Sequence, residues 1–208
     1  MESFRGYKIK GRKGMSHWAC VLEEWMLAIE RYTRIMDGED APYYYSERAN
    51  ISVLAGAAWK AGWVALEEFQ SEKGYRNRAK TNGRTDLYFA NEMSEELIEA
   101  KFQWICMGSG NLGGMVHEHM SLAVRDAKKS RANSKSVRSI GVGFFPVYKK
   151  NTRIDNVDEL IDQTISEFEK QDHHAIAWCF PIEMRNHVAE NSGNLLPGIV
   201  MIAKNVDH

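Results

Sequence analysis

The sequence has no long hydrophobic run and few cysteines. No apolar stretch approaches the roughly 20 residues of a membrane-spanning helix, and the stretch MESFRGYKIKGRKGMSHW is basic but lacks the apolar segment of a secretory signal. The three cysteines, at positions 20, 106 and 179, are far apart and odd in number, which argues against a disulfide framework or a cysteine-rich zinc site. A reducing compartment is the simplest setting, and we expect a cytoplasmic protein.

The sequence also lacks an excess of charge of one sign. Its 27 Lys and Arg residues against 28 Asp and Glu residues give a formal net charge of −1. Contact with a nucleic acid would therefore require a local basic patch. Hydrophobic residues make up 44% and charged residues 26% of the 208 positions, which is the composition of a globular chain rather than a disordered one. No internal repeat or low-complexity tract is present, and the length fits one domain with a sizeable core.

Residues 1–45 are predicted to form an N-terminal extension, made of a basic arm and an amphipathic helix. In HWACVLEEWMLAIERYTRIM, bulky apolar residues recur at spacings of three and four: Trp18, Leu22, Trp25, Ile29 and Tyr32. This pattern is typical of a helix with one apolar stripe. We expect the stripe to pack on the core. The alternative is a partner face, which would suit a homodimer.

Residues 46–208 are predicted to form one compact domain. Ser46 is expected to cap a helix over 47–62, and the short turn NEMSE is expected to join two strands as an antiparallel hairpin. The expected strands cover 63–70, 84–91, 96–104, 139–148, 175–180 and 198–203, and two further helices cover 115–129 and 156–171. This order predicts an α/β or mixed α+β fold with a central mixed sheet flanked by helices.

Three charged residues interrupt the strand-like runs of the hairpin: Asp86, Glu99 and Lys101. Because side chains alternate across a strand, all three can lie side by side on one sheet face if the hairpin register allows it, and we assume that register. Two carboxylates held close together repel each other, and a divalent cation relieves this repulsion. Mg²⁺ prefers a few carboxylate oxygens and several waters. With a lysine to stabilise developing charge, these side chains form a minimal set for metal-assisted phosphodiester hydrolysis.

The pattern of Asp86 followed by Glu99, Ala100 and Lys101 resembles the PD-(D/E)xK, or restriction-endonuclease-like, nuclease superfamily. The resemblance covers residues 46 to about 147 and implies a core with the order αβββαβ. It also implies Mg²⁺ or Mn²⁺ as the cofactor and DNA as the substrate. Asp86 and Glu99 would then be metal ligands, and Lys101 would assist the attacking water. Many nucleases that cut both strands act as dimers.

The resemblance implies two more site residues. Glu47 matches the family's further acid by its position at the start of the first core helix, and Glu68, at the end of the first strand, is the weaker alternative. Gln103, two residues after the lysine, matches a polar position seen in some members. One position departs from the motif: Thr85 stands where the family has a proline before Asp86, which makes the motif less specific.

Basic residues near the second strand and after the third helix are candidate contacts for nucleic-acid phosphates. They are Lys73, Arg76, Arg78, Lys80, Arg84, Lys128, Lys129 and Arg131. The simpler alternative is that these are solvated loop residues.

Three other interpretations stay open. The hairpin charges could be a solvent-exposed ion pair of Glu99 with Lys101. The same fold could serve as a non-catalytic nucleic-acid-binding or assembly module. Gly108, Gly110 and Gly113 form a GxGxxG pattern, so a nucleotide-binding enzyme built on the 108–114 turn is a weaker alternative. It is weaker because no strand with a ribose-binding acid follows at the expected distance.

Overall fold

The described part of the chain folds into eight strands and four α-helices. The structure is a computed structural model that describes residues 4–11, 14–73, 81–130, 137–150 and 156–207, without the side chains of 71–73, 81 and 82. Its strands are β1 (Phe4–Ile9), β2 (Val64–Lys73), β3 (Thr81–Asn91), β4 (Ser94–Phe102), β5 (Ile105–Cys106), β6 (Val137–Lys149), β7 (Ala175–Phe180) and β8 (Leu195–Asn205). Its helices are α1 (Ala19–Ile35), α2 (Glu47–Lys60), α3 (Leu112–Ser130) and α4 (Val157–Glu169), with the 3-10 turns η2 (Ser16–Trp18) and η3 (Pro42–Tyr44).

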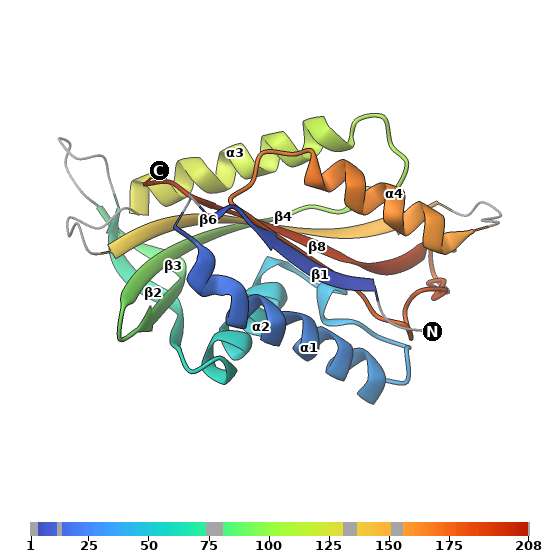
Figure 1. Ribbon diagram of the computed structural model, residues 1–208, viewed down its shortest axis with the longest axis horizontal. Helices are drawn as coiled ribbons and strands as arrows, with labels where there is room; N and C mark the ends of the chain where they lie inside the picture. Colours follow the sequence, from blue (N-terminus) through green and yellow to red (C-terminus); the bar gives the residue numbers. More distant parts are fainter. Residues whose placement is uncertain (1–3, 12–13, 74–80, 131–136, 151–155, 208) are drawn as a thin grey trace.

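The strands form one mixed sheet with helices on both faces (Figure 1). The strand order is β1-β7-β8-β6-β4-β3-β2, and the short β5 pairs with β6. Helices α1 and α2 lie along one face of the sheet, and α3 and α4 lie along the other. The predicted mixed sheet flanked by helices is therefore confirmed. Within the described residues, no helix combines the length and the apolar composition that crossing a membrane requires.

The predicted helix cap and hairpin are both present. The side chain of Ser46 accepts a hydrogen bond from the backbone N–H of Ala49, which caps α2. β3 and β4 pair antiparallel across the turn after Asn91, as the short NEMSE turn predicts. The local signals of the sequence are thus sufficient to specify both features.

The N-terminal region contributes a strand and a helix to the same structure. β1, in the stretch predicted to be a basic arm, pairs antiparallel with β7 at the edge of the sheet. The stripe of α1 packs into the core, since Trp18, Leu22, Trp25 and Ile29 are each no more than 1% exposed. The prediction that the stripe packs on the core is confirmed. These four side chains are buried against the core, and the homodimer stays a prediction.

Each face of the sheet has its own hydrophobic core. On the side of α1 and α2, Leu87, Phe89 and Ile98 are fully buried. On the side of α3 and α4, Phe145 packs against Phe168 with ring centroids 5.7 Å apart. Since the central strands are covered on both faces, a charged side chain on them is desolvated and needs a partner. The charges of β4 therefore call for an explanation.

Candidate functional site

The sheet forks between β3 and β4. Pairing between these strands ends at Leu87 and Ile98. Beyond that point β3 stays paired with β2, and β4 stays paired with β6. Asp86 and Glu99 are the next residues on each strand, so they lie where the fork begins. The register also places them on the same face, as the sequence analysis had assumed.

The backbone of Ala100 connects two of the predicted site residues at this fork. Its N–H donates a hydrogen bond to Oδ2 of Asp86 (2.8 Å), and its carbonyl oxygen accepts one from Nζ of Lys101 (2.6 Å). Because β3 has separated from β4 here, side chains satisfy backbone groups that a neighbouring strand would otherwise satisfy. The first hydrogen bond fixes the orientation of Asp86, and the second holds the ammonium group of Lys101 against the Ala100 carbonyl oxygen.

Glu99 is buried rather than exposed to solvent. Its relative exposure is 3%, and its Oε1 accepts a hydrogen bond from Oγ of Ser130, at the end of α3 (2.5 Å). Nζ of Lys101 lies 3.5 Å from Oδ2 of Asp126 on the same helix. These contacts contradict the alternative of a solvent-exposed Glu99–Lys101 pair, because the carboxylate of Glu99 has been removed from water.

Asp126 is an acid at the fork that the sequence analysis did not select. Its Oδ1 accepts a hydrogen bond from Nζ of Lys129 (3.0 Å). Burial by itself would raise the pKa of Asp126, but the hydrogen bond from Lys129 and the charge of Lys101 outweigh it and hold the pKa below its usual range. Asp126 is therefore ionised at neutral pH and positions two lysines. The sequence signal for it was the helical spacing of Asp126, Lys129 and Ser130 along one face of α3.

Glu47, in the first turn of α2, completes the cluster. Burial raises the pKa of Glu47 above its usual range. The charge of Lys101 lowers this pKa, and three nearby carboxylates raise it: Asp86, Glu99 and Asp126. The four acids and the lysine therefore act on one another electrostatically. We call Glu47, Asp86, Glu99, Lys101 and Asp126 the fork cluster.

A Glu47→Gln variant should be more stable than the wild-type protein at pH 7. The folded-state pKa of Glu47 is raised, so the native state is most favoured while Glu47 is protonated, below about pH 4.5, the usual pKa of a glutamate. That stability is lost as the pH rises through the folded-state pKa. Thermal unfolding in EDTA at pH 7 should therefore show a higher melting temperature for Glu47→Gln, and the difference should shrink towards pH 4. Glu39→Gln, at an exposed position, is the control, and an equal gain in both variants would contradict the burial of Glu47.

Two glycines of β6 allow α3 to approach the fork cluster. Gly141 and Gly143 pair with Glu99 and Lys101 in the parallel register, so they lie on the face that α3 covers. A Cβ on Gly141 would lie 2.8 Å from the backbone nitrogen of Val124 in α3. Only glycine leaves room for this contact between the backbone of α3 and strand β6. Close packing of α3 is what brings Asp126 and Ser130 to the fork.

The fork cluster thus joins three predicted acids, the predicted lysine and an acid from α3. No family model, no curated protein and no solved structure matches this chain. The chemistry of the fork cluster is therefore the basis for assigning a function.

The fork carries oxygen atoms from acidic side chains and from the backbone, the ligand type that Mg²⁺ prefers. Within the described ranges, no group of three or more His, Cys, Asp or Glu side chains is arranged to hold a metal ion. Asp86 and Glu99 nevertheless supply two carboxylates. The Ala100 carbonyl supplies a third oxygen, which accepts a hydrogen bond from Nζ of Lys101. Mg²⁺ is commonly held by only one or two carboxylates and keeps several waters. Mg²⁺ or Mn²⁺ as the cofactor stays a prediction.

The other residues suggested by the family resemblance lie in different surroundings. The side chain of Gln103 donates to the backbone carbonyl of Trp104 (2.9 Å), and its proposed role stays a prediction. Glu68, the weaker alternative to Glu47, pairs with Arg48 (2.8 Å) and with Arg84 (3.2 Å). Its charge is thereby compensated by two arginines, which favours Glu47 as the acid of the cluster.

The predicted nucleic-acid contacts are only partly described by the structure. Arg84 and Lys128 are exposed, and Lys129 is held by Asp126 (3.0 Å). Four residues and one side chain lie outside the described residues: Arg76, Arg78, Lys80, Arg131 and the side chain of Lys73. Phosphate contact by this set stays a prediction.

The 108–114 turn has a conformational reason for at least one glycine. Gly108 has a φ of 72°, a value that favours glycine, and it connects β5 to the start of α3. Nζ of Lys149 donates to the backbone carbonyl of Met107 beside it (3.2 Å). Nucleotide binding by this turn stays an untested prediction.

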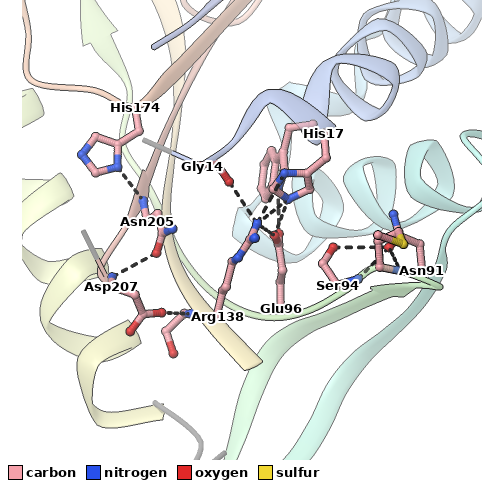
Figure 2. A network of polar contacts seen from close by, with 12 residues as sticks. Gly14, His17, Asn91, Ser94, Glu96, Arg138, His174, Asn205 and Asp207 are labelled. Atoms are coloured by element: carbon pink, nitrogen blue, oxygen red, sulfur yellow. Dashed lines mark hydrogen bonds and ion pairs between the residues drawn. The ribbon is translucent and has the colours of Figure 1, made fainter. Parts of the chain in front are cut away.

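A second polar cluster surrounds Glu96 (Figure 2). Glu96 is fully buried and accepts a hydrogen bond from Nε1 of Trp18 (2.6 Å), while Nε2 of His17 lies 2.5 Å from its other oxygen. Nη1 of Arg138 lies 3.6 Å from Glu96 and donates to the carbonyl of Gly14 (3.0 Å). A buried carboxylate needs such partners. These contacts attach the segment before α1 to β4 and β6.

Proposed function

We propose that the chain is a metal-dependent nuclease that hydrolyses phosphodiester bonds in DNA. The observation that carries the proposal is the meeting of Asp86, Glu99 and Lys101 at the β3–β4 fork, with Glu99 buried and Lys101 against a backbone carbonyl. Burying neighbouring carboxylates costs stability. Clusters of this kind are typical of functional sites, where a cation and a phosphate compensate the charges.

The order of elements around the fork supports a restriction-endonuclease-like core. Helix α2, strands β2, β3 and β4, helix α3 and strand β6 follow one another as αβββαβ, with only the two-residue β5 added. Helix α2 contributes Glu47, and α3 contributes Asp126. The acids of the proposed site therefore come from both helices as well as from the hairpin.

In this proposal Asp86 and Glu99 hold Mg²⁺ or Mn²⁺, and Glu47 and the Ala100 carbonyl are further oxygen ligands. A bound divalent cation would acidify a water and neutralise charge on the phosphate. Lys101 positions the attacking water or stabilises the charge that develops on the phosphate. Asp126 keeps Lys101 at the fork through their ion pair.

A non-catalytic nucleic-acid-binding or assembly module is the second candidate. It is favoured by one observation, the absence among the described residues of a preformed group of three metal-ligating side chains. In such a module the acids at the fork would be relics. The two candidates differ in whether a bound cation leads to cleavage.

Binding of Mg²⁺ should stabilise the wild-type protein, and Asp86→Asn should remove most of that gain. A cation at 100 times its Kd stabilises the native state by about 2.7 kcal/mol. Asn keeps the shape of the side chain and an acceptor for the Ala100 N–H, but it lacks the charge. The measurement is thermal unfolding against MgCl₂ or MnCl₂, run beside an assay for cleavage of labelled DNA with the same proteins.

The wild-type protein should show both a higher melting temperature and cleavage. Glu39→Gln, a change at an exposed position, should behave like the wild type in both assays. Stabilisation without cleavage would favour the non-catalytic module. If neither cation shifts the melting temperature and the DNA stays intact, the proposed function is wrong.

A further inference from the structure

We propose that the protein has a nucleobase-stacking pocket beside the fork cluster, which takes an unpaired base of the nucleic acid. This inference deepens the proposed nuclease function and rests on it. The pocket has a volume of about 440 Å³, which lies in the usual range for small-ligand sites. The side chains that carry the argument are those of Trp104, Tyr148, Lys150, Asn191 and Asn194.

The aromatic wall of the pocket is held in place by neighbouring rings. Trp104 and Tyr148 meet edge to face, with centroids 6.3 Å apart and planes at 72°. Tyr44 packs against Trp104 at 6.2 Å, and His187 packs against Tyr44 at 6.0 Å. Rings fixed in this way lose little freedom on binding. A flat aromatic face of this kind stacks on any nucleobase.

The opposite wall is a turn closed by backbone hydrogen bonds. The N–H of Gly193 donates to the carbonyl of Ala189 (2.7 Å), and the N–H of Ala189 donates to the carbonyl of Asn194 (2.9 Å). The hydroxyl of Tyr44 donates to the carbonyl of Leu196 (3.3 Å), which connects this turn to the aromatic wall. These hydrogen bonds hold the turn in place as one wall of the pocket.

The polar groups of the pocket suit a nucleotide. Asn191 and Asn194 carry amides that can both donate to and accept from the edge of a base. Lys150 adds a positive charge at an exposed position, which favours a phosphate. Apolar rings, amides and one cation together match a nucleotide better than a purely apolar ligand.

Only a short length of chain separates the pocket residues from the fork cluster. Trp104 follows Lys101 by three residues, and Tyr44 precedes Glu47 by three residues. Three extended residues span at most about 10 Å. The Lys101 side chain lies against α3 and Trp104 lies against Tyr44, so a strand with its phosphate at Lys101 would reach Trp104 past the side of β4 that β3 leaves unpaired. A base in a duplex is already stacked and paired, so the pocket predicts a preference for single-stranded or unpaired DNA.

A binding assay with a labelled single-stranded oligothymidylate in EDTA tests the pocket without cleavage. Trp104→Leu, which keeps apolar bulk but removes the aromatic face, should weaken binding about tenfold or more. Trp104→Phe keeps an aromatic face and should bind within about threefold of the wild type. A blunt duplex of the same length should be much less affected by Trp104→Leu.

The matched control is Trp59→Ala, since Trp59 has an accessible ring (55% exposed) but belongs to α2 and does not line the pocket. It should bind single strands like the wild type. Equal affinity of Trp104→Leu and the wild type for the single strand would overturn the pocket, and so would an equal loss on single strand and duplex. Circular dichroism and the melting temperature in EDTA show whether the variants remain folded. If Trp104→Leu is unfolded, binding by Trp104→Phe decides: near-wild-type binding supports the pocket, and a tenfold loss overturns it.

The outcome also separates this inference from the proposed function. If the wild-type protein cleaves DNA and Trp104→Leu binds single strands as tightly as the wild type, the nuclease proposal holds and the pocket proposal fails. If Trp104→Leu weakens single-strand binding but the wild-type protein does not cleave DNA with Mg²⁺, the pocket proposal holds and the nuclease proposal fails.

Discussion

A Lys101→Met variant should lose about 100- to 1,000-fold in the rate of DNA cleavage, which is the usual cost of removing one group that stabilises developing charge. Methionine keeps most of the length of the side chain, so packing at the fork should change little. The loss should fall on kcat, because Lys101 is proposed to act on the reacting phosphate rather than on the rest of the substrate. Steady-state cleavage at saturating Mg²⁺ measures it.

Metal binding should survive in the same variant. The proposed ligands, Asp86 and Glu99, are unchanged in Lys101→Met, so Mg²⁺ should still raise its melting temperature. Lys60→Met is the matched control, because Lys60 lies at the end of α2 and outside the fork cluster. Cleavage at the wild-type rate by Lys101→Met would remove the lysine from the mechanism and would leave the fork cluster without its proposed chemistry.

A Gly141→Ala variant should lose about 1–3 kcal/mol of stability, as overpacked positions do. The added Cβ would lie 2.8 Å from the backbone nitrogen of Val124 and 3.0 Å from the backbone carbon of Ala123. Because both are backbone atoms, no side-chain rotation relieves the contact, and α3 must move away from β6. That movement would draw Ser130 away from Glu99. Chemical denaturation should therefore show a lower midpoint, and cleavage should fall as well.

The matched control is the same substitution in α2. A Cβ on Gly56 meets nothing within 4 Å, and the residue is exposed in the middle of the helix. Gly56→Ala should therefore stabilise the protein by about 0.5–1 kcal/mol. Opposite signs for the two substitutions would confirm that the contact with α3, and not the loss of a glycine, is responsible. Equal effects would contradict the close packing of α3.

Much of the fold followed from short-range patterns. The apolar periods of α1 and α4, the cap at Ser46 and the alternation along β4 each depend on neighbours within a few residues. The hairpin turn was short enough to specify antiparallel pairing. Alternation puts Asp86, Glu99 and Lys101 on one face only for the register that the structure shows. The nuclease role of these residues stays a proposal.

The sequence did not predict strand β1, because the residues that stabilise it are far away in the chain. β1 looked like a basic arm because Arg5 and Lys8 interrupt it, yet these residues pair with Glu30 and Glu169 across the fold at 2.6 Å each. Charged side chains of this kind are common on edge strands, where they prevent pairing with other chains. Gly6 also packs closely against Trp178, because a Cβ added to Gly6 would lie 2.7 Å from the Trp178 ring. None of these contacts leaves a local period in the sequence.

The sequence by itself determined the order of helices and strands from α1 to β8 apart from the short β5, and the burial of the α1 stripe. It could do so because helical period, strand alternation and capping are local properties of the chain. Only the tertiary structure decided that β3 and β4 separate at Asp86, that Gly141 lets α3 bring Asp126 and Ser130 to Glu99, and that Trp104 and Tyr148 face a common pocket. Those features depend on close contacts between residues far apart in the chain, which no local pattern records.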